Sequence, residues 1–101
     1  GWTELREYLS DVIEDLEGPI YLSLDMDAID PAFAPGVGTP EPLGMTPYEV
    51  IQTINFFSDR IVGFDCVEVC PPHDNGNTSA LAARLIRHLV GAVWQSQQRF
   101  K

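Results

Sequence analysis

The chain has 101 residues, of which 45% are hydrophobic, so it is large enough for one domain with a modest core. Its formal net charge of −9 argues against binding to nucleic acid or to an anionic membrane, because both present negative phosphates. The sequence has no apolar stretch of the about 20 residues that a membrane span needs and no signal-peptide pattern at its start, so we expect a cytoplasmic protein.

The first two predicted elements are a helix and a strand. Apolar residues recur at helical spacing over residues 3–17, with Thr3 as the N-cap and Gly18-Pro19 as the stop. The run PIYLSLDM, residues 19–26, is short, continuous and apolar. Such a run is typical of a strand that is covered on both faces, as in a parallel sheet.

The next predicted element is a helix over residues 47–58. Thr46 is followed by a proline at the first helical position and by Glu49 three residues later. This pattern is a capping box, in which the threonine and glutamate side chains each accept a backbone N–H of the other residue.

The last two predicted elements are a strand and a long helix. RIVGFDCVEVC, residues 60–70, indicates a second buried strand that ends at Pro71-Pro72. The periodicity of residues 78–98 predicts a helix capped near Asn77 or Thr78.

The order helix, strand, helix, strand, helix predicts an α/β fold built on one right-handed βαβ crossover. We expect residues 1–101 to form a single domain. Two parallel strands alone leave both sheet edges open, so we expect this chain to assemble with further strands or to be a piece of a larger α/β protein.

The two cysteines, Cys66 and Cys70, have three residues between them. This spacing fits neither a C-x-x-C redox pair nor a zinc site with further cysteines. We therefore expect both to be small buried apolar residues in a reducing compartment.

Three aspartates, Asp25, Asp27 and Asp30, lie within six residues at the end of the first strand. Because strand side chains alternate, Asp25 and Asp27 are predicted to share a face at the carboxyl end of the strand, where open α/β sheets bind ligands. Two close carboxylates favour a divalent cation such as Mg²⁺ or Mn²⁺ between them. A phosphoryl-transfer aspartate and an acidic turn without chemistry are the alternatives. Asp30 precedes Pro31, and its carboxylate is expected to accept backbone N–H groups in a turn.

Glu68 lies near the end of the second predicted strand, on the same face as Cys66 by alternation. A charged residue at that place needs a partner, which is either a substrate or an arginine such as Arg84 or Arg87. Asp65 is predicted on the opposite face, where it either supports a metal ligand or is solvated or bonded to backbone.

Three stretches of the sequence match one family signature. SLDMDAIDP, residues 23–31, fits the pattern S-x-D-x-D-x-x-D-P at each fixed position, and PGVGTPEP, residues 35–42, matches the loop that follows it. VEV before Pro71-Pro72 is similar to the segment E-V-x-P-P. With these stretches the chain resembles the ureohydrolases, the binuclear manganese enzymes that include arginase and agmatinase, and the loop favours the agmatinase form.

The resemblance implies a fold, a cofactor and a set of site residues. The fold would be a portion of the three-layer parallel-sheet arginase-like architecture. Asp25 would bridge two Mn²⁺ ions and Asp27 would ligate one of them. Asp25 and Glu68 would be catalytic residues, while Glu68 and Thr39 would line the pocket for a small cationic guanidino substrate. The implied reaction converts agmatine into putrescine and urea, in an enzyme that is a homo-oligomer when complete.

The chain also departs from the family pattern. The family has further metal ligands in G-G-D-H-type and D-A-H-x-D-type motifs, and neither motif occurs here. The two histidines, His73 and His88, are expected at the pocket edge or surface and on a helix face. We therefore predict that the chain is the carboxyl-terminal part of an agmatinase-like enzyme and that it is inactive by itself.

Two other functions compete with this interpretation. One is a non-catalytic metal-binding or oligomerisation module of the same fold. The other is a haloacid-dehalogenase-like phosphatase, which also places D-x-D at a strand end. That family follows the pair with Gly-Thr, whereas AIDP follows here, and the only lysine is Lys101.

Overall fold

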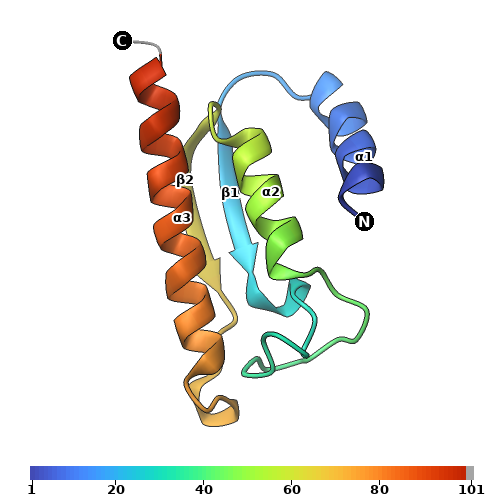
Figure 1. The fold of residues 1–101 in the computed structure, drawn as a ribbon, viewed down its shortest axis with the longest axis vertical. Coiled ribbons are helices and arrows are strands. Elements are labelled where there is room, and N and C mark those ends of the chain that lie inside the picture. The colour runs from blue at the N-terminus through green and yellow to red at the C-terminus, as the bar shows by residue number, and fades with distance from the viewer. Residues whose placement is uncertain (100–101) are drawn as a thin grey trace.

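The computed structural model describes residues 1–99, with side chains up to Gln98, so Lys101 lies outside the described residues. Helices and strands alternate in the predicted order (Figure 1). The elements are α1 (Trp2–Glu14), β1 (Ile20–Asp25), the short 3₁₀ helix η1 (Met26–Ala28), α2 (Pro47–Phe57), β2 (Ile61–Val67), the 3₁₀ helix η2 (Pro71–His73) and α3 (Asn77–Arg99).

The two strands form a parallel pair, as predicted. Leu24 pairs with Cys66 and Asp25 with Val67, and the register is irregular at the start of β1. Both strands point toward the same end of the molecule, where the segment from η1 to α2 and the segment from β2 to α3 lie (Figure 1). The carboxyl ends of the strands therefore lie next to each other.

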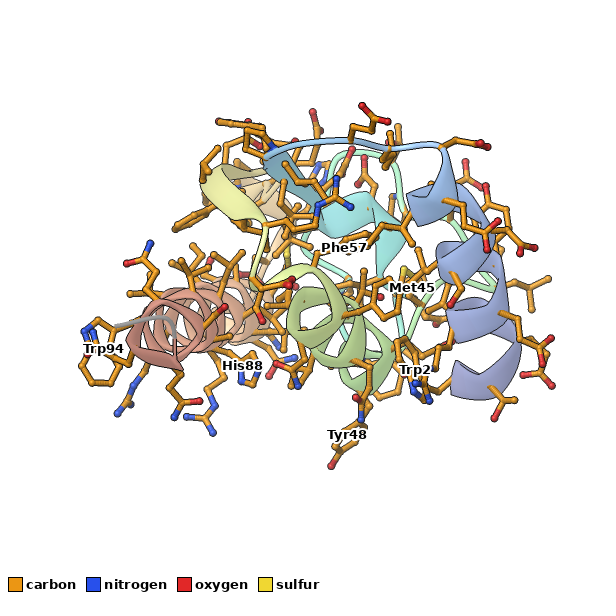
Figure 2. All side chains as sticks on the ribbon, turned by 90° about the horizontal axis from the view of Figure 1, so that it is seen from above. Trp2, Met45, Tyr48, Phe57, His88 and Trp94 are labelled. Atoms are coloured by element: carbon orange, nitrogen blue, oxygen red, sulfur yellow. The ribbon has the colours of Figure 1, made fainter. Side chains whose placement is uncertain are left out.

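The hydrophobic core lies between one face of this sheet and helices α2 and α3, with α1 beside α2 (Figures 1 and 2). Its buried members are Leu24, Met26, Ile29, Ala34, Val37, Val50, Ile54, Phe57, Ile61, Ala82, Leu85 and Leu89. The other face of β1 is open, and Tyr21 is 62% exposed. The prediction that β1 is covered on both faces is wrong for this chain, because all three helices lie on one side of the sheet.

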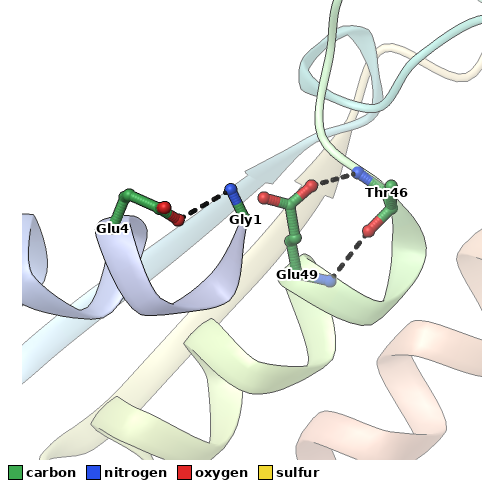
Figure 3. A network of polar contacts seen from close by, with 4 residues as sticks. All are labelled: Gly1, Glu4, Thr46 and Glu49. Atoms are coloured by element: carbon green, nitrogen blue, oxygen red, sulfur yellow. Dashed lines mark hydrogen bonds and ion pairs between the residues drawn. The ribbon is translucent and has the colours of Figure 1, made fainter.

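The start of α2 confirms the predicted capping box (Figure 3). The Thr46 hydroxyl accepts from the Glu49 backbone N–H at 3.2 Å, and the Glu49 carboxylate accepts from the Thr46 N–H at 3.0 Å. The start of α1 lies nearby, where the amino group of Gly1 is 2.9 Å from the carboxylate of Glu4. This contact raises the pKa of the amino group and lowers the pKa of Glu4.

The predicted N-cap of α1, Thr3, is wrong by two residues, since the observed N-cap is Gly1. The helix begins at Trp2 rather than after Thr3, because the Leu5 N–H already donates to the carbonyl oxygen of Gly1 at 3.2 Å. The helix also ends at Glu14, earlier than the predicted Glu17. Helix ends are the part of an element that periodicity determines least.

The predicted caps of α3, Asn77 and Thr78, are also wrong. The carboxylate of Asp74 accepts from the backbone N–H groups of Thr78 at 3.0 Å and Ser79 at 2.9 Å, and from the Ser79 hydroxyl at 2.8 Å. Burial raises the pKa of Asp74, but these hydrogen bonds outweigh it and lower the value to about 2. Asp74, three residues before the first residue of α3, therefore provides the side-chain cap.

Both cysteines are free and only half-buried, and Cys66 packs against the core, so the prediction that both are buried is correct only in part. Burial raises the pKa of the Cys66 thiol, and the carboxylates of Asp65 and Asp25 add to this effect. Among residues 1–99, none of the helices has the length and apolar character that a bilayer crossing requires.

Candidate metal and substrate site

The site begins where β1 ends. β1 stops at Asp25, and the chain turns at once into η1, because Asp25 Oδ1 accepts from the Asp27 N–H at 2.9 Å. Met26 is completely buried and anchors the turn in the core. Asp27 is therefore not a strand residue, and the prediction that alternation places it beside Asp25 is wrong. The turn, rather than the strand, brings the two aspartates together.

The two oxygens of Asp27 differ in their surroundings. Oδ2 accepts from the Thr39 hydroxyl at 3.1 Å, while Oδ1 is buried and has no hydrogen-bond partner among the described residues. A buried carboxylate oxygen without a partner is costly, because the desolvation of its charge is not compensated. This oxygen is suited to a hard cation. The hydrogen bond between Thr39 and Asp27 also brings together two residues that only the family resemblance had linked.

The residues present fit part of a manganese site. Carboxylate oxygens are suitable ligands for Mn²⁺, and Asp25 and Asp27 provide them at the carboxyl end of a parallel strand. Within residues 1–99, however, no group of three or more histidine, cysteine, aspartate or glutamate side chains lies close enough to hold a metal ion. The chain therefore offers two candidate ligands, and a complete coordination shell would need others.

Asp30 shapes the loop that follows, as predicted. Its Oδ1 accepts from the Ala32 N–H at 2.9 Å, and its Oδ2 accepts from the Gly44 N–H at 3.2 Å. Backbone hydrogen bonds between Ala28 or Asp30 and Met45 close the same loop, with distances of 2.8 and 2.9 Å. One carboxylate thus connects the two ends of a loop of more than ten residues.

Glu68 follows β2 rather than belonging to it, because the strand ends at Val67. Its φ angle is 71°, a left-handed conformation that costs a residue with a Cβ atom roughly 1–2 kcal/mol. The parity argument for its direction is therefore wrong. Glu68 is exposed, and within the described residues its carboxylate pairs with neither Arg84 nor Arg87, since the one ion pair found there joins Gly1 and Glu4.

Asp65 has side-chain partners that the sequence did not indicate. The Ser23 hydroxyl donates to its Oδ1 at 2.6 Å and the Tyr21 hydroxyl donates to its Oδ2 at 3.1 Å. The hydrogen bond to Asp65 raises the pKa of Tyr21. A prediction of the register between β1 and β2 could have found this network, because Ser23 lies opposite Asp65 in the parallel pair.

The two histidines each contact a neutral oxygen of this chain. The His73 ring Nδ1 is 3.0 Å from the carbonyl oxygen of Val37, so Nδ1 carries the proton in this contact. His88 Nε2 is 2.8 Å from the Asn55 side-chain oxygen, on the facing surfaces of α2 and α3. His73 is exposed and His88 lies on the face of α3 toward α2, which are the kinds of place that the sequence predicts for them.

Fold and site together define the class: a parallel α/β unit that gathers carboxylates and a Pro/Gly-rich loop at the carboxyl end of its strands. Comparison with known proteins narrows this class, because the profile of the arginase family matches residues 1–91. The chain belongs to the arginase family.

Two similar relatives give the same result. The chain is 48% identical over 77 residues to the mitochondrial guanidino acid hydrolase of Homo sapiens. This alignment covers 74% of this chain and 22% of that protein. It is 45% identical over 89 residues to the mitochondrial agmatinase of Gallus gallus, over 86% of this chain and 24% of that protein. The chain thus spans about a quarter of the length of the curated relatives that it matches.

A solved structure supports the fold. The agmatine ureohydrolase of Thermoplasma volcanium matches with a TM-score of 0.84 at 42% identity, over 93% of this chain and 32% of that chain. The predicted family and the predicted arginase-like α/β fold are confirmed, and the haloacid-dehalogenase alternative is not supported.

Proposed function

We propose that this chain is the part of a binuclear manganese ureohydrolase that supplies Asp25 and Asp27 as metal ligands, and that the complete enzyme hydrolyses the guanidinium group of agmatine to putrescine and urea. The observation that carries the proposal is the buried, unpartnered Oδ1 of Asp27, a residue whose backbone N–H donates to Asp25 Oδ1. The names of two relatives, an agmatinase and a guanidino acid hydrolase, support a guanidino compound as the substrate.

Each site residue has a distinct part in this proposal. Asp25 and Asp27 would hold the metal pair, and when bound, the pair supplies Lewis acidity that activates water near neutral pH. The two carboxylates reduce the local positive charge, so that a cationic guanidinium can approach. The Glu68 carboxylate would accept hydrogen bonds from the guanidinium N–H groups, and Thr39 would line the pocket next to Asp27.

The chain alone would bind manganese weakly and release no urea, because two carboxylates give only part of the chelation that a binuclear site needs. We therefore propose that the missing ligands come from segments outside these residues. The open edges of a two-stranded sheet support assembly with further strands and a homo-oligomeric complete enzyme.

A chimera tests the proposal directly. Residues 1–91 would replace the matched segment of the agmatine ureohydrolase of Thermoplasma volcanium, and urea release would be measured with Mn²⁺ and either agmatine or 4-guanidinobutyrate. The chimera should prefer agmatine. Asp25→Asn and Asp27→Asn should each lower kcat/KM by more than about 100-fold, since even residues that only support a ligand cost 10–100-fold. Asp59→Asn, outside the site, is the matched control and should leave activity unchanged.

Two results would contradict the proposal. A folded chimera that binds Mn²⁺ but keeps its activity after Asp25→Asn would remove the metal role of that residue. Urea release by the isolated 101-residue chain, above a control with Mn²⁺ alone, would show that the site is complete without further ligands. A preference of the chimera for 4-guanidinobutyrate would move the substrate assignment to the guanidino acids.

A further inference from the structure

We infer that Asp74 and Thr78, at the start of α3, are positioning residues that hold the loop of residues 33–39 so that the Thr39 hydroxyl stays on Asp27. The inference deepens the proposed function and rests on it only where substrate is concerned. The contacts themselves lie entirely within this chain.

The first half of the loop is fixed to residues 70–78, which run from the end of β2 into the first turn of α3. Four hydrogen bonds join the two stretches, from Cys70 N–H to Gly36 O at 2.8 Å, from Gly36 N–H to Thr78 Oγ1 at 2.8 Å, between His73 Nδ1 and Val37 O at 3.0 Å, and from Asn77 Nδ2 to Phe33 O at 3.2 Å. We call this set the loop clamp. It connects residues that are about forty positions apart in the sequence.

The central bond of the loop clamp is buried. Thr78 has no exposed surface, and its hydroxyl meets the Gly36 N–H in a buried environment. A backbone N–H left without a partner there would bear the full desolvation penalty. Removing the Thr78 hydroxyl should therefore loosen the loop at Gly36 rather than only weaken the helix.

Asp74 fixes the place at which Thr78 acts. Its carboxylate accepts from the Thr78 N–H and from Ser79, so the first turn of α3 is held against the loop. A Cβ atom at Gly36 would lie 2.4 Å from Asp74 Cβ, a distance that real Cβ atoms do not reach. Position 36 therefore requires glycine, since only the absence of a side chain lets the loop approach Asp74.

The second half of the loop has no such support. Residues 38–43 form no backbone hydrogen bond among the described residues, and the side chain of Leu43 is 97% exposed. The one side-chain hydrogen bond found in this stretch is the contact between Thr39 and Asp27. Because Thr39 follows the last clamped residue, Val37, by two positions, the loop clamp determines where its hydroxyl can lie.

The first experiment measures the loop in the 101-residue chain by NMR, without any reaction. Thr78→Val should speed amide exchange of Gly36 about tenfold, the effect of losing roughly one buried hydrogen bond, and should lower the order parameter of the Thr39 methyl group. Thr78→Ser keeps the hydroxyl and should restore both values. Thr53→Val is the matched control, because the Thr53 hydroxyl bonds the Glu49 carbonyl oxygen within α2 and does not touch the loop.

A second variant covers the case in which Thr78→Val does not fold. Asn77→Ala removes the exposed bond to Phe33 O and should speed exchange across residues 33–37 about threefold, with the fold intact. Unchanged exchange at Gly36 together with an unchanged Thr39 methyl order in the folded variants would overturn the inference.

The second experiment measures the consequence for substrate in the chimera described above. Thr78→Val should raise KM for agmatine about fivefold and should raise the Mn²⁺ concentration needed for half-maximal activity, because Thr39 lines the proposed pocket and also donates to the proposed ligand Asp27. Altered loop dynamics with an unchanged KM would reduce Thr78 to a structural residue. An inactive parent chimera would contradict the proposed function, whereas the NMR results would still decide the inference.

Discussion

The two strands of the sheet end in opposite ways. After β1, the chain enters a turn in which the Asp25 carboxylate accepts from the Asp27 N–H and the Met26 side chain is buried. The core therefore fixes the backbone that carries both aspartates. After β2, Glu68 is exposed, adopts a φ angle of 71° and has no side-chain partner among the described residues. The end of β1 is preorganised by this chain, whereas the end of β2 holds a strained residue that no described side chain fixes.

The largest expected effect comes from breaking the ordered end. Gly44→Ala would place a Cβ atom 2.6 Å from the backbone nitrogen of Asp30 and 2.9 Å from the carbonyl oxygen of Ala28. Backbone atoms cannot move aside as a flexible side chain does, so we expect a loss of about 3 kcal/mol in the free energy of unfolding. Urea denaturation of the 101-residue chain measures this loss.

Gly91→Ala is the matched control for that substitution. A Cβ atom at Gly91 would meet nothing within 4 Å, and the residue lies inside α3. Alanine should therefore stabilise the chain by about 0.5–1 kcal/mol through its higher helix propensity. Equal effects of the two substitutions would show that the close approach of Gly44 to Asp30 does not contribute to stability.

A smaller effect, of opposite sign, is expected at the strained end. Glu68→Gly removes the cost of a left-handed conformation, although the greater freedom of glycine in the unfolded chain offsets part of the gain. We expect the chain to become about 1 kcal/mol more stable in urea denaturation. In the chimera the same variant should lose activity, and a variant that is both less stable and fully active would refute the contrast between the two ends.

The smallest expected effect is the change with pH in the stability that Asp74 contributes. The pKa of Asp74 is lowered from its ordinary value of 3.8 to about 2, so the folded state favours the charged form. The stability that this carboxylate contributes is present above its ordinary pKa and is lost as the pH falls toward about 2. The difference in Tm between the wild-type chain and Asp74→Ala should therefore be constant at neutral pH and shrink below about pH 4. A constant difference down to pH 2 would show that the carboxylate does not titrate with folding.

Local signals in the sequence predicted the features that depend on near neighbours. The capping box at Thr46 and Glu49 is an exchange within three residues, and Asp30 binds backbone groups of its own loop. Both were found because the partners are fixed by short spacing.

Sequence reasoning failed where an element ended earlier than its apolar pattern. Alternation was extended to Asp27 and Glu68, but β1 stops at Asp25 and β2 at Val67. Strand alternation does not predict which way a side chain points once a turn or a left-handed residue has interrupted the strand. The loop clamp was missed for a different reason, since Thr78 and Gly36 are brought together only by the tertiary fold.

Met26 connects the packing of the protein to its chemistry. The side chain is completely buried in the core, and its two neighbours in sequence are the proposed metal ligands. A substitution that changes the volume at this position would shift the backbone on which both carboxylates stand. Stability and the geometry of the two proposed ligands therefore cannot be adjusted independently at residue 26.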